Sequence, residues 1–143
     1  MKDLSPSLED YLEAAYTLSL KDGFARACAI SRLLKVSKPS VNSAVKVLAA
    51  RGLLEHERYG YIRLSAEGLR AGAEISGKHS LLKDFLVSVL AIDEVRAERD
   101  ACRAEHALSP GTLKRVGALA VFLKAPRQRR LLLAARAAAR KAG

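Results

Sequence analysis

The stretch ARACAISRLLKVSKPSVNSAVKVLAARGLLEHERYGYIRL, residues 25–64, decides the fold of this chain. Its first part predicts a short helix from Arg26 to Leu34, and Lys35-Val36-Ser37 leaves room only for a tight connection. Ser37 is placed to cap a second helix, in which Pro39 falls near the first turn and apolar residues recur at helical spacing. Two helices joined by so short a turn form a helix-turn-helix.

The residues that follow change to the period of β-strands. Arg51-Gly52 closes the second helix, and residues 53–64 then predict two short strands around a glycine turn at Tyr59-Gly60-Tyr61. A hairpin directly after a helix-turn-helix is a wing. The chain is therefore predicted to be mainly α and to begin with a winged helix-turn-helix that has a two-stranded wing.

Helices are predicted on both sides of this stretch. Ser5 and Pro6 mark the start of a helix that Asp22-Gly23 ends. After the wing, with Ser65, Asp93 and Ser109 as N-caps, further helices are predicted over residues 66–90, 93–106, 109–123 and 127–141. The junction at residues 65–71 is the best domain boundary. We expect a winged-helix domain over residues 1–71 and an all-helical domain over residues 72–143.

Composition narrows the classes of protein that need to be considered. The chain has 143 residues, of which 50% are hydrophobic, enough to fold around a core. Two cysteines, Cys28 and Cys102, do not make a disulfide framework, and the polar N-terminus does not resemble a signal peptide. No apolar run approaches the roughly 18 residues of a membrane span. We expect a cytoplasmic protein with free thiols and no membrane association.

Charge points to nucleic acid as the partner. The chain carries 25 Lys and Arg against 15 Asp and Glu, and the stretch between Gly23 and Leu54 contains basic residues but no acid. The first residues of a recognition helix meet base edges, and flanking basic residues meet phosphates. The residues expected to contact DNA are Arg26, Ser37, Lys38, Pro39, Ser40, Asn42, Ser43, Lys46 and, on the wing, Arg58. The alternative is a solvated face of a winged helix that binds protein. The basic tail after Ala107 fits DNA contact and dimer packing about equally.

A group of side chains in the second half has metal-binding chemistry. Cys102, Glu105 and His106 stand at positions i, i+3 and i+4, so on a helix they share one face. A thiolate, a carboxylate and an imidazole that converge in this way can hold a divalent transition metal. A Glu-His pair on a helix is more often a solvated face, so the spacing leaves both interpretations open.

Two other places in the chain offer further candidate ligands. Asp10 and Glu13 are three residues apart beside the buried stripe of the first helix, and His79 lies on the long helix at the edge of its apolar face. An Asp-x-x-Glu pair in a first turn is normally explained by the helix dipole. Taken alone, neither place establishes a metal site.

The chain resembles the diphtheria toxin repressor family, and especially its manganese transport regulator branch, over residues 3–123. The resemblance is carried by five runs: SPSLEDYLE at 5–13, VSKPSV at 36–41, GLLEHERYG at 52–60, KHSLL at 78–82 and DACRAEHALS at 100–109. It implies an N-terminal winged helix, a C-terminal helical dimerisation domain and a metal held between them. The family's ligand positions fall on Asp10, Glu13, His79, Cys102, Glu105 and His106.

The chain departs from each branch of that family at specific positions. Asp10 is similar to the manganese branch, whereas Cys102 is similar to the iron branch. Glu98 matches a second-site ligand of the iron branch, but Lys83 stands where that branch has a carboxylate, which puts the second site in doubt. Carboxylates suit Mn(II), and a thiolate suits Fe(II), Co(II) or Zn(II). We expect Mn(II) or Fe(II), with Mn(II) as the first candidate.

The sequence therefore predicts a metal-dependent repressor that binds double-stranded operator DNA as a homodimer and controls metal homeostasis. The alternative is a winged-helix regulator that responds to a small molecule, or to redox state through Cys102. No His-Glu-x-x-His, Gly-x-Ser-x-Gly or phosphate-loop run is present, so we expect neither an enzyme nor a small-molecule substrate.

Overall fold

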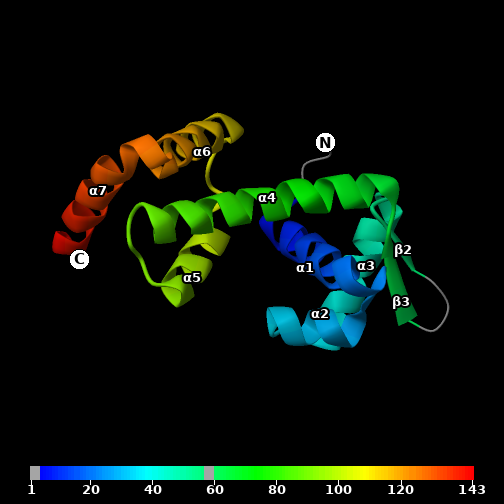
Figure 1. Ribbon diagram of the computed structural model, residues 1–143. Helices are drawn as coiled ribbons and strands as arrows, with labels where there is room; N and C mark the ends of the chain where they lie inside the picture. Colours follow the sequence, from blue (N-terminus) through cyan, green and yellow to red (C-terminus); the bar gives the residue numbers. More distant parts are fainter. Residues whose placement is uncertain (1–3, 57–59) are drawn as a thin grey trace. The chain divides into compact units, whose positions relative to one another are not determined.

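The computed structural model describes residues 4–56 and 60–143, and the chain divides into two compact units, one ending at Ser76 and the other beginning at Gly77 (Figure 1). The first unit confirms the winged helix-turn-helix. Its elements are α1 (Pro6–Asp22), β1 (Ala25–Arg26), α2 (Ala27–Leu34), α3 (Lys38–Ala50), β2 (Leu54–His56), β3 (Tyr61–Leu64) and the first part of α4 (Ala66–Ser88).

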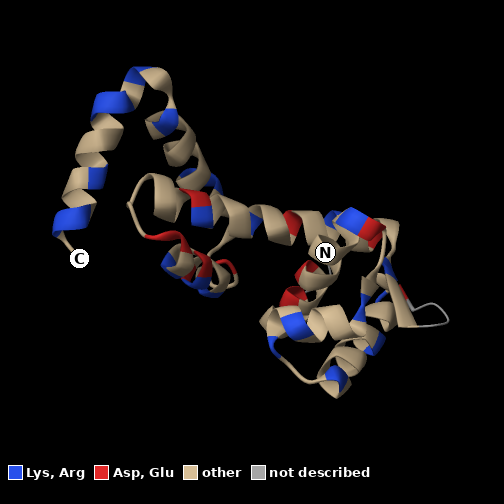
Figure 2. Cartoon of the chain, turned by 60° about the horizontal axis from the view of Figure 1, so that its bottom comes forward, with Lys and Arg blue, Asp and Glu red and all other residues tan. Residues whose placement is uncertain are grey.

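The helix ends follow the capping residues that the sequence indicated. Ser5 accepts a hydrogen bond from the Leu8 N–H at the start of α1, and Gly23, with φ of 75°, ends that helix by donating to the Ser19 carbonyl. Lys35 takes the left-handed conformation in the turn between α2 and α3, where Ser31 Oγ donates to the Val36 carbonyl at 2.6 Å. These local bonds fix how α3 leaves α2. The helix-turn-helix so formed carries Lys and Arg without a single acid (Figure 2).

The sheet has one strand more than predicted. The hairpin β2–β3 is antiparallel, with Leu54 opposite Leu64, and β1 pairs with the outer side of β3, with Ala25 opposite Ile62. The strand order is therefore β1-β3-β2. A strand of two residues is too short to show an alternating pattern, which is why the sequence did not indicate β1. Arg58 and Tyr59, assigned to the wing, lie outside the described residues.

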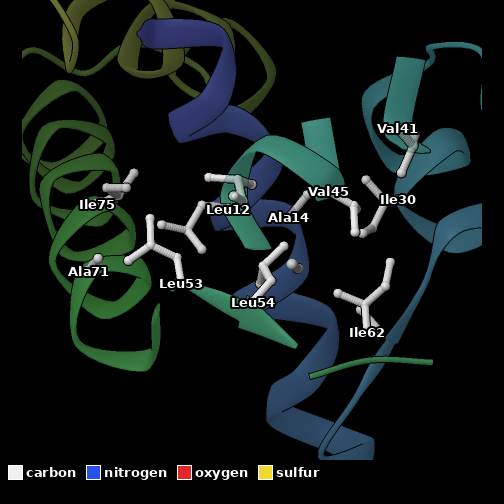
Figure 3. Packing of buried hydrophobic residues seen from close by; sticks show 13 residues of the cluster. Leu12, Ala14, Ile30, Val41, Val45, Leu53, Leu54, Ile62, Ala71 and Ile75 are labelled. Carbon is white, nitrogen blue, oxygen red and sulfur yellow. The ribbon is translucent and has the colours of Figure 1, made fainter. Parts of the chain in front are cut away.

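One hydrophobic cluster holds the first unit together (Figure 3). Val41 and Leu48 of α3 are fully buried, and they belong to the same cluster as Leu12 of α1, Ile62 of β3 and Ile75 of α4. Burial of each such side chain stabilises the fold by roughly 1.5–3 kcal/mol. Because this cluster takes one face of α3, the opposite face of the same helix is held outward.

The second unit is all-helical. It consists of the rest of α4, then α5 (Glu94–Ala104), α6 (Pro110–Lys124), the 3-10 helix η2 (Pro126–Gln128) and α7 (Arg129–Lys141). Asp93 and Ser109 cap α5 and α6 through the N–H groups of Arg96 and Thr112, as the sequence predicted. Leu82, Ala101 and Leu113 form its small buried cluster.

Three helix boundaries differ by two residues from the predicted ones. α4 ends at Ser88, two residues early, and α5 ends at Ala104 instead of His106. α7 begins at Arg129 because Pro126 opens a 3-10 turn before it. None of the described residues of α7 is buried, but Arg136 Nη1 donates to the Ser88 carbonyl at 2.8 Å. The basic tail thus satisfies a carbonyl at the end of α4.

Within the described residues, no helix combines the length and the apolar character needed to cross a lipid bilayer.

Candidate nucleic-acid interface and metal centre

The outer face of α3 carries the residues predicted to contact DNA. The exposed set on and before this helix is Ser37, Lys38, Pro39, Ser40, Asn42, Ser43 and Lys46. Small side chains at the tip let a helix approach a groove closely, and Asn can pair with adenine. The structure therefore presents these residues together on one surface.

The start of α3 also has the chemistry of an anion site. The first backbone N–H groups of a helix have no carbonyl partners within the helix, and they favour phosphate. Ser37 Oγ accepts the Ser40 N–H at 3.3 Å and contacts Ser40 Oγ at 2.8 Å, while the first turn of α3 contains no acid. The hydroxyl of Ser37 is thus used in the cap, and Lys38 beside it is left exposed.

Arg26 is held at the base of the wing. Its Nη2 atom donates to the Tyr61 hydroxyl at 3.1 Å, and its guanidinium lies 5.0 Å from the Tyr61 ring centroid and 5.8 Å from that of Phe24. Phe24 and Tyr61 pack edge to face, with their centroids 4.5 Å apart. Sequence reasoning missed Phe24, although an aromatic residue directly after the helix-ending Gly23 was a usable signal. Arg26 remains exposed while its direction is set by these rings.

In the second unit, three candidate ligands lie together. His79 Nδ1 of α4 is 2.9 Å from Glu105 Oε2, and His106 Nε2 is 3.3 Å from Glu105 Oε1. The Glu105 side chain is only 1% exposed, and those of His79 and His106 are 14% and 11% exposed. A buried carboxylate between two imidazoles is an arrangement with the donors that transition metals take.

One atom of this cluster lacks the partner that its burial demands. Among the described residues, Glu105 Oε1 is the buried side-chain atom with no hydrogen-bond partner, since the contact with His106 does not have hydrogen-bond geometry. Leaving a buried polar atom unsatisfied costs about 1–3 kcal/mol, and more when it is charged. A divalent cation would satisfy this oxygen, so the residues present fit a metal.

Cys102, near the end of α5, is a further candidate ligand in the second unit. Cys102 is exposed, and its Sγ lies within 4.8 Å of a Glu105 carboxylate oxygen. Glu105 keeps helical angles, with φ −59° and ψ −33°, and its N–H still donates to the Ala101 carbonyl. Although the helix formally ends at Ala104, the local backbone thus preserves the spacing of Cys102 and Glu105 that the sequence suggested. His106 follows in the turn.

The remaining two candidate ligands belong to the first unit. Asp10 and Glu13 are both half-buried on α1, three residues apart and therefore on one side of the helix. Leu12 between them is fully buried, which fixes the rotation of α1 about its axis. The other four candidates, His79, Cys102, Glu105 and His106, all lie in the second unit.

Two further charged groups contact His79 or its neighbours. Glu98 Oε1 is 3.0 Å from His79 Nε2, and Glu98 Oε2 is 2.7 Å from Lys83 Nζ. The hydrogen bond from Lys83 holds the pKa of the Glu98 carboxyl below its usual range, and Glu98 in turn raises the pKa of Lys83. The position that raised doubt about a second metal site is thus filled by an ammonium group.

Two domain families match the chain in succession. Residues 3–62 match the family described as iron dependent repressor, N-terminal DNA binding domain. Residues 65–129 match the family described as iron dependent repressor, metal binding and dimerisation domain. The two matches meet at the wing-to-α4 junction.

Individual relatives agree with these matches. The HTH-type transcriptional regulator MntR of Shouchella clausii is 33% identical over 120 residues, covering 84% of this chain and 83% of the relative. An uncharacterised HTH-type transcriptional regulator of Methanocaldococcus jannaschii is 36% identical over 115 residues, covering 79% and 91%. A solved structure, a manganese-dependent transcriptional repressor in complex with manganese, is similar with a TM-score of 0.72 at 26% identity. That likeness covers 80% of this chain and 53% of the solved one, so the chain spans about half its length.

Proposed function

Because the chain belongs to the iron-dependent repressor family, which is the family of the diphtheria toxin repressor, we propose that it represses transcription by binding operator DNA when it holds Mn(II) or Fe(II). It acts as a homodimer in the cytoplasm, with residues 1–71 on DNA and residues 72–143 for metal and dimerisation. The observation that carries the metal requirement is the buried Glu105 carboxylate, which faces two imidazoles and has an oxygen without a hydrogen bond.

The proposed ligands come from both units. Asp10 and Glu13 of α1 bind the same cation as His79, Cys102, Glu105 and His106, and these donor types support a divalent transition metal. When bound, the cation neutralises carboxylates that would otherwise repel one another and links the two units. The shared side of α1 on which Asp10 and Glu13 lie supports this set.

The relatives favour a metal effector over a small molecule or a redox signal. One is named MntR, and one solved structure is titled a manganese-dependent repressor in complex with manganese. Measuring the metal content of the purified protein separates the two proposals, since a redox sensor working through Cys102 needs no metal. The relatives are transcriptional regulators, and we propose that this chain likewise has no catalytic role.

DNA binding follows from the direction in which α3 points. A dimer that inserts two recognition helices must match half-sites about one helical turn apart, or a multiple of it. The two protomers of the dimer therefore have to hold their α3 helices at the correct spacing. Metal ligation by residues of both units within each protomer would favour that spacing. The exposed apolar residues Leu119, Val121 and Phe122 of α6 lie within the segment that matches a dimerisation domain and support a dimer contact there.

The experiment that tests this function begins by selecting bound duplexes from a random pool in the presence of Mn(II). Fluorescence anisotropy then measures affinity for the selected duplex with Mn(II), with Fe(II) under anaerobic conditions, and with chelator. We expect metal to tighten binding about 5- to 150-fold, the usual range of allosteric coupling. Equal affinity with metal and with chelator would remove the proposed switch.

The DNA-facing surface makes a separate prediction. Lys46→Ala should weaken binding to every duplex about equally and reduce the slope of log affinity against log salt by about one, because an exposed lysine on α3 contacts phosphate. Lys114→Ala on α6 is the matched control, since it removes the same charge from an exposed position outside the helix-turn-helix. If both variants change the salt slope equally, the change is not specific to α3, and the predicted phosphate contact of Lys46 is contradicted.

A further inference from the structure

The contacts around His79 assign a role to two residues that the ligand set leaves out. We propose that Lys83 and Glu98 position His79, holding its Nε2 atom as the protonated nitrogen and leaving its Nδ1 atom to bind metal beside Glu105. This inference rests on the proposed metal-binding function. It concerns residues of the second unit only, and the three distances on which it rests join atoms of that unit.

Hydrogen-bond geometry gives the first step. Both ring nitrogens of His79 face carboxylates, with Nδ1 2.9 Å from Glu105 and Nε2 3.0 Å from Glu98. A neutral imidazole has one proton, and a nitrogen that binds metal cannot keep it. The buried Glu105 is a proposed metal ligand, so the nitrogen on its side has to be the unprotonated one. The proton then belongs on Nε2, where Glu98 accepts it.

Charge and exposure give the second step. The Glu98 side chain is 55% exposed, so packing alone does not fix its carboxylate. Lys83 Nζ holds Glu98 Oε2 at 2.7 Å, which leaves Oε1 directed at His79. His79 and Lys83 are four residues apart on α4 and share a face of that helix. The ammonium therefore orients the carboxylate that orients the imidazole.

The same pair decides that Glu98 is a positioning residue and not a ligand. One of its oxygens is taken by an ammonium and the other by an imidazole nitrogen. A carboxylate that holds the far nitrogen of a metal-binding histidine fixes the tautomer and the ring orientation, and its loss typically weakens metal binding about 10- to 100-fold. Lys83 acts one step further out, so its loss should have a smaller effect.

The first test reads the histidine itself. Long-range proton–nitrogen spectra of the metal-free and Zn(II)-loaded full chain, with His79 assigned by comparison with H79Q, report which ring nitrogen carries the proton. We expect Nε2 to be protonated in both states of the wild type, and Glu98→Gln to shift the His79 nitrogen signals. Protonation at Nδ1 of the neutral ring, or His79 signals unchanged by Glu98→Gln, would overturn the proposal.

The second test reads affinity for Mn(II). Glu98→Gln should raise the dissociation constant about 10- to 100-fold. Lys83→Met should raise it about 2- to 5-fold, as expected for loss of a partly exposed ion pair, and Lys83→Arg should restore wild-type binding. Lys124→Met is the matched control, because it breaks a 2.8 Å pair with Asp84 at a lysine of similar exposure. Equal effects of Lys83→Met and Lys124→Met on the dissociation constant would contradict the proposed positioning of His79 by Lys83 and Glu98.

Failure of this inference can be told apart from failure of the proposed function. A wild-type chain that binds neither Mn(II) nor Zn(II) removes the metal-dependent function, whereas the metal-free spectra still decide whether Glu98 sets the tautomer of His79. If Glu98→Gln and Lys83→Met both leave Mn(II) binding normal, the proposed function stands. The proposed positioning of His79 by Lys83 and Glu98 is then wrong.

Discussion

Replacing His106 with Ala is expected to abolish the metal response of DNA binding. The imidazole is 11% exposed and its Nε2 atom lies 3.3 Å from the unsatisfied oxygen of Glu105, so its removal takes away a donor where a ligand is needed. In the wild type, Mn(II) should tighten binding to the selected duplex about 5- to 150-fold. In the variant, anisotropy titrations with Mn(II) and with chelator should coincide, while the weak metal-free affinity stays as it was.

Two controls separate loss of a ligand from loss of packing. Leu108→Ala removes a partly buried side chain two residues away, next to the cluster of the second unit, and should keep the metal response. On α1, Asp10→Ala should lose the response while Glu9→Ala, which removes the neighbouring acid, should keep it. A full response in either His106→Ala or Asp10→Ala would mean that the ligand assignment is wrong.

Gly68→Ala is expected to destabilise the winged-helix unit by about 3 kcal/mol, at the upper end of overpacking effects. A Cβ at this position would overlap the carbonyl oxygen of Leu53 and lie 2.9 Å from its carbonyl carbon. That carbonyl cannot easily retreat, because it accepts a hydrogen bond from the Ser65 N–H at 3.1 Å and belongs to a buried leucine. For a unit of this size, such a loss lowers the melting temperature by about 10 °C or more.

The same helix offers the matched substitution. Gly77 of α4 has nothing within 4 Å of a Cβ, so Gly77→Ala should stabilise the chain by roughly 0.5–1 kcal/mol through the higher helix propensity of alanine. Urea unfolding followed by circular dichroism compares the midpoints of the two variants with that of the wild type. A midpoint for Gly68→Ala at or above that of the wild type would show that the close approach of α4 to Leu53 does not constrain the fold.

Local signals explain why much of the fold could be predicted from the sequence. Ser5, Ser37, Asp93 and Ser109 each cap the helix assigned to them, because a capping hydrogen bond depends on residues only three positions apart. The buried stripe of α3 followed for the same reason, since Val41, Val45 and Leu48 repeat at the helical period. The polar residues between these buried positions, such as Asn42, Ser43 and Lys46, are exposed for the same reason.

Features that depend on distant contacts were not predictable. β1 forms because Ala25 and Arg26 pair with β3, more than thirty residues later in the chain. A stretch of two residues contains no pattern that predicts this pairing. The pair between Lys83 and Glu98 joins α4 to α5, and so does the contact of His79 with Glu105. Spacing within one helix put Cys102 and Glu105 on a common face, but no spacing rule could have assigned each nitrogen of His79 its carboxylate.

The most direct measurement of the central claim is anomalous scattering from crystals of the full chain grown with Mn(II). One cation bound jointly by Asp10 or Glu13 of α1 and by Glu105 and His106 of the second unit is the predicted result. A cation held by residues of the second unit alone, with both α1 carboxylates in solvent, would contradict it.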